Sequence, residues 1–325
     1  MTQLAKPPDD SASKPVRKQK TLDLTVLAGG PSAEREVSLQ SGAAVTAALV
    51  RLGHRVNVRD INPENLSALD VPADFVFIAL HGAFGEDGQV QDLLARRGIA
   101  FCGSDAAASA LAMNKAAAKA RLVEAGVPTP RYHVFRHPRA RCAADRLGCW
   151  RLPVVIKPVN SGSSVDTYIA RDAFAFQSML ERVSGRHGTA LIEQYVHGPE
   201  LTVGIIGDQA LPVCQIRTRR EFYDYQAKYI DDDTEYLFDI DLPADLLRRI
   251  QDLSVKAHDA LGCRDFSRVD WMVDARTLEP YVLEINTIPG FTSHSLLPKA
   301  AARVGISFDQ LCQRIIELGL ARHGR

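Results

Sequence analysis

The sequence predicts an α/β protein whose N-terminal part is a doubly wound, mostly parallel sheet. Apolar segments of strand length alternate with helical segments over residues 22–97. The run at residues 75–80 is apolar throughout, which is typical of a parallel strand buried on both faces. Glycine-rich turns follow two of these strands. Alternation of strand, helix and strand builds such a sheet, and its ligands bind beyond the carboxyl ends of the strands.

Length and composition limit the possible classes of protein. The chain has 325 residues, enough for two or three domains, and its 39 basic and 39 acidic residues cancel. A net charge of zero argues against a nucleic-acid-binding or membrane-surface protein, because both rely on a basic face. No apolar run approaches the roughly 18 residues of a membrane span. We therefore expect neither nucleic acid nor membrane as a partner.

Cysteines and the N-terminus indicate the compartment. The six cysteines are irregularly spaced and include no CxxC pair, so we expect reduced thiols rather than disulfides or a zinc site. Residues 1–20 are rich in Lys, Pro, Asp and Ser and lack the hydrophobic stretch of a secretory signal. We expect a cytoplasmic protein with a disordered N-terminal extension; a basic docking tail is the alternative.

The first elements end in two candidate ligand-binding turns. The expected elements are a strand at 22–28, a helix ending near residue 52, strands at 55–60 and 75–80, and a helix at 89–97. Ser32, after a GGP turn, is the expected N-cap of the first helix. Neither turn is GxGxxG and no GxxxxGK occurs, so a Rossmann-type oxidoreductase and a P-loop protein are poorly supported.

Two polar residues in these turns are candidates for ligand contacts. Glu34 lies at the start of its helix, where it either complements the helix dipole or grips the ammonium group of a ligand. His81 stands at a strand end before a glycine, and loop residues at strand ends are seldom needed for packing. His81 is therefore the better candidate, and both readings of Glu34 remain open.

The central part contains a candidate phosphate-binding site. Lys115 and Lys119 lie in an alanine-rich helical region, and Lys157 ends an apolar strand. A loop of Asn, Ser and Gly follows at residues 160–164. Such a loop offers backbone N–H groups and hydroxyls to a phosphate, and the lysine adds a point charge. A simple linker is the alternative.

The remaining chain contains one segment without a regular pattern. The expected elements are a helical region at 106–126, strands at 152–157, 190–193, 201–206 and 211–216, and helices at 244–261 and 308–320. Residues 217–241 carry many charges and tyrosines but show no sustained period. Long loops inside compact domains tend to cover functional sites, although a surface insertion is the alternative.

Residues 267–295 hold the most chemically specific pattern. They are expected to form a hairpin with strands at 268–273 and 281–286, in which side chains two apart share a face. With the strands in register, one face carries Arg268, Asp270, Glu284 and Asn286, and the core face carries Val269, Trp271, Leu283 and Ile285. The oxygen ligands of Asp, Glu and Asn suit Mg²⁺. The hairpin therefore predicts a magnesium site; a half-exposed hairpin with a charged outer face is the alternative.

The order of these motifs resembles that of the D-alanine–D-alanine ligases of the ATP-grasp superfamily. The matching runs are GGPSAEREVS (29–38), HG (81–82), GEDG (85–88), MNK (113–115), KP (157–158), GSSV (162–165), FYDY (222–225), AKY (227–229), RVD (268–270), EIN (284–286), PG (289–290) and SHSL (293–296). Each run is short, but together they extend in order over the whole chain after residue 21. A chance match of that extent is not credible.

The resemblance implies a fold and an activity. The fold is a three-domain ATP-grasp fold, with an N-terminal α/β domain at 21–112 and two lobes, 113–197 and 198–325, that sandwich ATP. The last lobe would hold the metal site and an active-site loop at 217–241. The activity is ATP-dependent joining of two D-alanine molecules through a D-alanyl phosphate, releasing ADP and phosphate, for peptidoglycan precursor synthesis. The family tends to form homodimers.

The resemblance also implies roles for the nucleotide and metal residues. The phosphates would be held by Lys115 and Lys157, adenine by Glu193, Gln194 and Val196, and the ribose by Glu200. The other expected nucleotide contacts are Ser163, Ser164 and Lys228. Two Mg²⁺ or Mn²⁺ ions would be held by Asp270, Glu284 and Asn286, with Glu284 bridging.

A further set of residues would serve the amino-acid substrates. The resemblance implies that Glu34 meets the first D-alanine and joins Ser163 and Tyr229 in a network that closes the site. The set of substrate residues also includes Arg268 and Gly290, which would face the oxyanion, and Ser295 and Leu296, which would line the pocket of the second D-alanine. His81 is expected as a further substrate contact. The expected catalytic residues are Glu34, Ser163, Tyr229, Arg268 and Ser295. Relatives that use D-lactate lose this tyrosine, so Tyr229 favours D-alanine as the second substrate.

Two residues depart from the pattern of the family. Asp166 stands where glycine usually follows the SSV run, and it adds a Cβ and a negative charge beside a phosphate-covering loop. It either stiffens that loop or weakens ATP binding. Trp271 replaces a more usual aliphatic residue or Phe. No catalytic group is lost, which argues against a silent nucleotide-binding protein; a ligase for another D-amino or hydroxy acid is the nearest alternative.

Overall fold

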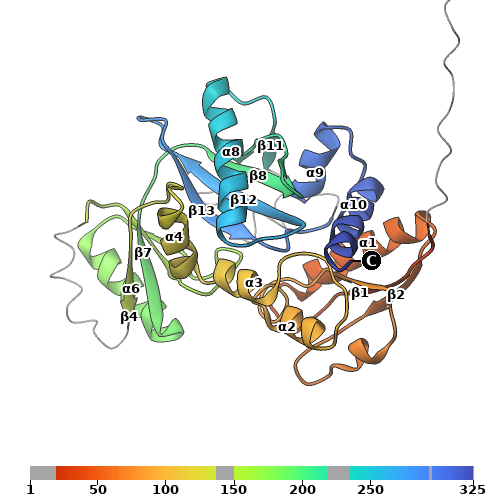
Figure 1. Ribbon diagram of the computed structural model, residues 1–325. Coiled ribbons are helices and arrows are strands. Elements are labelled where there is room, and N and C mark those ends of the chain that lie inside the picture. Colours follow the sequence, from red (N-terminus) through yellow and green to blue (C-terminus); the bar gives the residue numbers. More distant parts are fainter. Residues whose placement is uncertain (1–19, 137–149, 219–233, 293–294, 325) are drawn as a thin grey trace, which may run out of the picture.

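The computed structural model describes residues 20–136, 150–218, 234–292 and 295–324. Three sheets organise this part of the chain. A parallel sheet and a four-stranded sheet lie at opposite ends of the molecule, with the largest sheet between them (Figure 1). The predicted α/β class is confirmed.

The N-terminal sheet is parallel, as the alternation of strands and helices predicts, with strand order β2-β1-β3. Its elements are β1 (Asp23–Leu27), α1 (Arg35–Arg51), β2 (Arg55–Arg59), a 3-10 helix (Ser67–Asp70), β3 (Phe75–Ile78) and α2 (Gln89–Arg96). Strand β3 is buried along its whole length, which accounts for its uniformly apolar sequence.

The start of α1 differs from the sequence prediction. Glu34, not Ser32, occupies the N-cap position, and it makes no side-chain cap hydrogen bond. The Ser32 hydroxyl accepts a hydrogen bond from the Glu34 N–H at 3.1 Å and donates one to the His81 carbonyl at 2.6 Å. Ser32 therefore stabilises a turn before the helix, a role that short hydroxyl side chains fill as readily as capping.

The C-terminal helices complete the core of the N-terminal sheet. These are α9 (Leu296–Arg303) and α10 (Phe308–Arg322), and α10 lies near α1 (Figure 1). Arg51 Nη2 lies 2.6 Å from Asp309 Oδ1. Gly319 packs so tightly on Phe75 that a Cβ there would be 2.5 Å from the ring. The N-terminal sheet thus depends on the opposite end of the chain for its packing.

The predicted helical region at 106–126 is two helices, α3 (Ala106–Met113) and α4 (Lys115–Glu124). Asn114 separates them with an extended backbone, and its side chain accepts a hydrogen bond from the Ala117 N–H at 3.0 Å. This is N-cap geometry. It makes Lys115 the first residue of α4 and directs its side chain toward the central sheets.

The four-stranded sheet is antiparallel, with strand order β4-β7-β5-β6. Its elements are β4 (Tyr132–Arg136), β5 (Val154–Pro158), β6 (Tyr168–Ala170), α6 (Ala173–His187) and β7 (Thr189–Gln194). The sequence prediction missed β4, β6 and α6. For α6 the signals were present: Asp172 caps its start and Gly188 ends it in the left-handed region.

The largest sheet follows the order β11-β10-β8-β12-β13, and the short β9 pairs with β8. Its elements are β8 (Glu200–Ile206), β9 (Gln209–Ala210), β10 (Cys214–Arg217), β11 (Glu235–Leu237), α8 (Ala244–Ala260), β12 (Phe266–Val273) and β13 (Pro280–Asn286). Trp271 anchors this sheet: it is fully buried, and its indole N–H donates to Ser254 on α8 at 2.9 Å. The unusual tryptophan is therefore a packing residue.

Four of the six cysteines lie in the described part of the chain. Cys102, Cys214, Cys263 and Cys312 are free and buried. Burial raises the pKa of Cys102 to about 12, so this thiol is a core residue and not a nucleophile. Among the described residues, no helix is both long and apolar enough to cross a membrane.

Candidate active site

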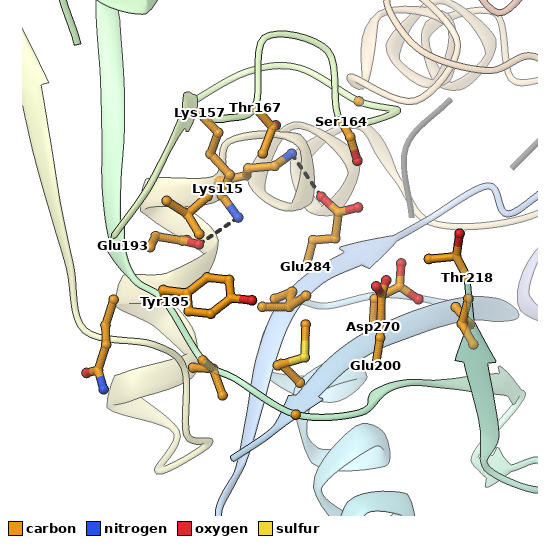
Figure 2. Close-up of a pocket in the computed structure, with 18 of the residues that line it drawn as sticks. Lys115, Lys157, Ser164, Thr167, Glu193, Tyr195, Glu200, Thr218, Asp270 and Glu284 are labelled. Atoms are coloured by element: carbon orange, nitrogen blue, oxygen red, sulfur yellow. Dashed lines mark ion pairs between the residues drawn. The ribbon is translucent and has the colours of Figure 1, made fainter. Parts of the chain in front are cut away.

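A pocket of about 340 Å³ lies between the four-stranded sheet and the largest sheet. Strands β5 and β7 form one wall, and β8, β10, β12 and β13 form the other (Figure 2). Its lining includes nine of the residues proposed from the sequence: Lys115, Lys157, Ser164, Glu193, Gln194, Val196, Glu200, Asp270 and Glu284. The expected nucleotide and metal residues thus converge from segments far apart in the chain.

Two lysines bring positive charge into this pocket from the side of the four-stranded sheet. Lys115 opens α4 and Lys157 lies on β5 near its end. Lys115 Nζ lies 3.0 Å from Glu284 Oε2, and Lys157 Nζ lies 2.8 Å from Glu193 Oε2 (Figure 2). Both lysine side chains are only 10% exposed, so their charges act in a partly desolvated space.

Glu193 is held between two lysines. Its side chain is 2% exposed, and Lys119 Nζ lies 2.8 Å from Oε1, opposite the contact with Lys157. Burial alone would raise the pKa of Glu193, but the two ammonium groups hold it below its usual value. Burial lowers the pKa of Lys119 to about 8, although Glu193 opposes that change.

The hairpin β12–β13 pairs as predicted where the polar residues lie. Asp270 is opposite Glu284 and Arg268 is opposite Asn286. Arg268 donates two hydrogen bonds to Asp270, from Nε to Oδ1 at 2.8 Å and from Nη2 to Oδ2 at 2.7 Å. Asn286 Nδ2 donates to Asp270 Oδ2 at 2.9 Å. Hydrogen bonds therefore join Arg268, Asp270 and Asn286, and Glu284 lies opposite Asp270 on the neighbouring strand.

The apolar face of the hairpin differs from the prediction at one position. The register shifts after Asp270, so that Trp271 pairs with Val282. Val282 is fully buried in the core, whereas Leu283 lines the pocket. The expectation that Leu283 faces the core was wrong, because a β-bulge inserts one residue and breaks the strict alternation.

The donor set fits a hard divalent cation. Asp270 and Glu284 line the same pocket with their carboxylates, and Asn286, whose Nδ2 donates to Asp270, carries an amide oxygen of the same hard-ligand type. No group of three His, Cys, Asp or Glu side chains in the described part of the chain is arranged as a metal site. The candidate set is therefore two carboxylates and one amide, which suits Mg²⁺ better than Zn²⁺.

The loop at 160–167 connects the pocket to the N-terminal helix α1. Ser163 donates a hydrogen bond to Oε1 of Glu34, the N-cap residue of α1. Its neighbours Gly162 and Ser164 line the pocket. Lys115 Nζ also donates to the Ser161 carbonyl at 2.5 Å. Glu34 and Ser163, two residues predicted to act on the amino-acid substrate, thus meet beside a loop that Lys115 also contacts.

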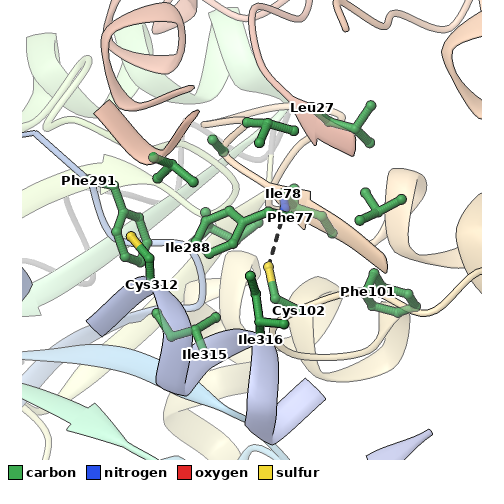
Figure 3. Close-up of a cluster of buried hydrophobic side chains, with 14 of the residues drawn as sticks. Leu27, Phe77, Ile78, Phe101, Cys102, Ile288, Phe291, Cys312, Ile315 and Ile316 are labelled. Carbon is green, nitrogen blue, oxygen red and sulfur yellow. Dashed lines mark hydrogen bonds between the residues drawn. The ribbon is translucent and has the colours of Figure 1, made fainter. Parts of the chain in front are cut away.

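His81 is buried and serves the loop that carries Gly290. Its Nε2 lies 3.1 Å from Ser41 Oγ, and its Nδ1 lies 3.2 Å from the Ile288 carbonyl. Ile288 and Phe291 enter the N-terminal core, where Phe291 packs edge-on against Phe77 at 5.4 Å (Figure 3). His81 therefore holds the loop at Ile288 in place through a buried hydrogen bond. Its position at a strand end did not predict this contact.

The remaining substrate candidates lie at the start of α9. Ser295 Oγ accepts a hydrogen bond from the Thr292 N–H at 2.9 Å, and a Cβ on Gly290 would come within 2.7 Å of this oxygen. Leu296 is buried in a small cluster with Cys214 and Ile216. Gly290 and Ser295 thus lie together. Lys228 and Tyr229 lie outside the described residues.

Several residues at the site were not predicted from the sequence. Lys119 is the main one, and its spacing of four residues from Lys115 on one helix was the available signal. Thr167, Met272 and Thr218 also line the pocket. Met272 shares its strand face with Asp270, so the period of a strand predicts its position.

Comparison with known proteins supports one family. Residues 54–104 match the family model of the D-ala D-ala ligase N-terminus, and residues 122–317 match that of the C-terminus. A D-alanine–D-alanine ligase from Nitrosomonas europaea is 44% identical over 91% of this chain and 96% of its own length. One from Syntrophotalea carbinolica is 42% identical over 90% of this chain and 94% of its own.

Solved structures give the same result. A D-alanine–D-alanine ligase from Bacillus anthracis superposes with a TM-score of 0.81 and 35% identity, over 94% of this chain and 99% of the other. The same enzyme complexed with ATP gives 0.80. A D-Ala:D-Ser ligase from Enterococcus faecalis gives 0.82 at 27% identity, over 92% of this chain and 100% of the other. The matched length and identity show that this chain belongs to the D-alanine–D-alanine ligase family.

Proposed function

We propose that this protein is an ATP-dependent D-alanine–D-alanine ligase that supplies the dipeptide for peptidoglycan precursors. The observation that carries the proposal is the pocket, in which Lys115 and Lys157 meet Asp270 and Glu284 between two sheets. Two cations and two carboxylates around one cavity suit the phosphates of a nucleotide and its divalent cations. A neighbouring structure of the same family was solved with ATP.

The nucleotide lies along the pocket in this proposal. Lys115 and Lys157 bind its phosphates, with the backbone and hydroxyl of Ser164 covering them. Glu193, Gln194 and Val196 line the end expected to hold adenine. Glu200, on β8, lies where the ribose is expected. Lys228 is proposed as a further nucleotide contact from its place in the AKY run.

Asp270, Glu284 and Asn286 would hold two Mg²⁺ or Mn²⁺ ions, with Glu284 shared between them. When bound, these cations neutralise the charge that spreads over the phosphoryl oxygens. The protein side chains prepare the arrangement: Arg268 and Asn286 fix both oxygens of Asp270 by hydrogen bonds of 2.7–2.9 Å. Activity that survives complete removal of divalent cations would contradict this part of the proposal.

The reaction proceeds in two steps. The carboxylate of the first D-alanine attacks the γ-phosphate, forming D-alanyl phosphate and ADP. The amine of the second D-alanine then attacks the acyl carbon, and phosphate leaves. Arg268 and the turn at Gly290 stabilise the developing oxyanion, a contribution of about 2.7–4 kcal/mol for one such donor. Glu34 binds the ammonium of the first D-alanine and is oriented by Ser163.

The acceptor site is proposed around Ser295 and Leu296 at the start of α9. Tyr229 supports D-alanine as the acceptor, whereas the fold similarity to a D-Ala:D-Ser ligase makes D-serine the second candidate. Competition of D-alanine with D-serine and D-lactate in one reaction decides between them. A predominance of D-alanyl-D-serine or of depsipeptide would overturn the choice of D-alanine.

The domain boundaries at 112 and 197, a homodimer and a cytoplasmic location belong to the same proposal. Sedimentation at working concentrations tests the dimer, and a mass of one chain would contradict it. Cell fractionation tests the location, and recovery of the protein outside the cytoplasmic fraction would contradict it.

The decisive experiment is ADP release from ATP and Mg²⁺ with D-alanine, with L-alanine, or with no amino acid, followed by separation of the products. We expect release that depends on D-alanine and yields D-alanyl-D-alanine. Release without any dipeptide, or equal release with L-alanine, would overturn the proposed function.

A further inference from the structure

Asp166 lies in the phosphate-covering loop with a left-handed backbone. Its φ is 52°, and Ser163 and Ser164 have φ of 51° and 56°. Three non-glycine residues in this region within four positions make a strained loop, because each costs free energy relative to an extended backbone. Contacts elsewhere must hold the loop in this shape.

The Asp166 side chain supplies such contacts. It is 7% exposed and accepts three donors: His187 Nε2 at 2.7 Å, Tyr168 Oη at 3.0 Å and Arg186 Nη1 at 3.1 Å. Arg186 and His187 are the last residues of α6, and Tyr168 begins β6. Asp166 thus joins the loop to both a helix end and a strand of the same sheet.

The carboxylate of Asp166 is directed away from the nucleotide pocket. Val165 and Thr167 line the pocket, but Asp166 between them does not. Hydrogen bonding to His187 and Tyr168, with the charge of Arg186, holds the pKa of Asp166 below its usual value, despite burial. A negative charge paired in this way repels a triphosphate less than an unpaired one would.

We propose that Asp166 is a positioning residue, which latches the phosphate-covering loop to the C-terminal end of α6 through His187 and Arg186. The latch holds Ser164 over the phosphates and Ser163 within reach of Glu34, so that one loop serves both the nucleotide and the amino acid. The proposal rests on the proposed function. Of the two effects expected of Asp166, stiffening of the loop or weakening of ATP binding, it assigns the first: Asp166 stiffens the loop and thereby favours ATP binding.

The test compares Asp166→Gly, His187→Gln and the double variant with the wild-type enzyme. Glycine relieves the backbone strain but removes the latch, so loss of function in that variant cannot come from strain. We expect the KM for ATP to rise about three- to tenfold for Asp166→Gly, as charge-assisted hydrogen bonds are lost, with kcat changed less than about twofold. The double variant should be no worse than Asp166→Gly, because both changes remove one interaction.

Two further measurements make the result specific. Glu181→Gln changes an exposed charge on the same helix and should leave the KM for ATP unchanged. The number of ADP molecules released per dipeptide should rise in Asp166→Gly, because a loose loop admits water to the acyl phosphate. Two results would overturn the latch. One is a higher thermal stability of Asp166→Gly with an unchanged KM for ATP. The other is a double variant in which the effects of Asp166→Gly and His187→Gln on the KM for ATP add.

Calorimetric titration with ATP separates this proposal from the proposed function. If the wild-type protein forms no dipeptide, the function fails, but ATP affinity still reports on the latch. Weaker ATP binding in Asp166→Gly and in His187→Gln, and not in Glu181→Gln, is the expected result. Equal ATP affinity in all four proteins would overturn the latch whatever the enzyme makes.

Discussion

Lys115 Nζ lies 3.0 Å from Glu284 Oε2, and this pair joins the two walls of the pocket. Lys115 belongs to helix α4 and Glu284 to strand β13. In the proposed reaction Lys115 binds a phosphate of the nucleotide and Glu284 binds a divalent cation. A nucleotide would compete with Glu284 for Lys115, and a cation would compete with Lys115 for Glu284. We therefore expect nucleotide and cation to bind cooperatively, since each releases the partner that the other needs.

Glu284→Gln tests the metal role of the hairpin. The change keeps the shape of the side chain but removes its charge, so we expect turnover to fall by about 100-fold or more while the fold survives. Steady-state dipeptide formation and a thermal melt measure the two effects. Glu279→Gln is the matched control, because Glu279 lies on the same hairpin but pairs with Arg249 outside the pocket. Near-normal turnover in Glu284→Gln would contradict a metal-binding role of the hairpin.

Lys119→Met tests whether this buried lysine positions Glu193. Without Lys119, Glu193 keeps only Lys157 as a cationic partner, and it would hold that lysine away from the nucleotide. We expect the KM for ATP to rise by about tenfold or more, with a smaller effect on the KM for D-alanine. Lys256→Met, at an exposed position of α8, serves as the control. Equal changes in both KM values would contradict a role specific to the nucleotide.

The same lysine predicts a pH dependence of stability. Its pKa is about 8 in the folded protein and 10.5 in its ordinary state, because burial disfavours the ammonium form. Between these values the unfolded chain binds more protons, so the contribution of Lys119 to the free energy of unfolding rises with pH, by at most about 3 kcal/mol.

Denaturant unfolding of the wild type and of Lys119→Met at several pH values between 7.5 and 10.5 measures this contribution. The difference in unfolding free energy, wild type minus variant, should increase across the range. A difference that falls as the pH rises would show that Glu193 holds the pKa of Lys119 above its ordinary value, contrary to the expected direction.

The sequence predicted the chemistry of the site better than its packing. Alternation along two short strands was enough to predict that Asp270 and Glu284 share one face of the hairpin, since side chains two apart share a face. The structure adds the register, in which Asp270 pairs with Glu284. The same rule failed at Leu283, where a bulge follows, because an inserted residue leaves no mark in a local pattern.

Packing over long sequence distances was likewise hidden from the sequence. His81 is fixed by Ile288 and Lys119 by Glu193, and neither partner is near in the chain. Periodicity identifies which face of an element is buried, but not which element covers it.

Glu34→Gln decides between the two interpretations of Glu34. If this carboxylate binds the ammonium of the first D-alanine, its loss removes a charge-assisted contact, and kcat/KM for D-alanine should fall about 10- to 100-fold with ATP affinity unchanged. If it only complements the dipole of α1, the change should lower stability slightly and leave kinetics intact. Glu36→Gln is the matched control, since Glu36 lies in the first turn of the same helix. Equal effects of the two variants on melting temperature, with no kinetic change in either, would assign Glu34 to the helix alone and move the ammonium site elsewhere.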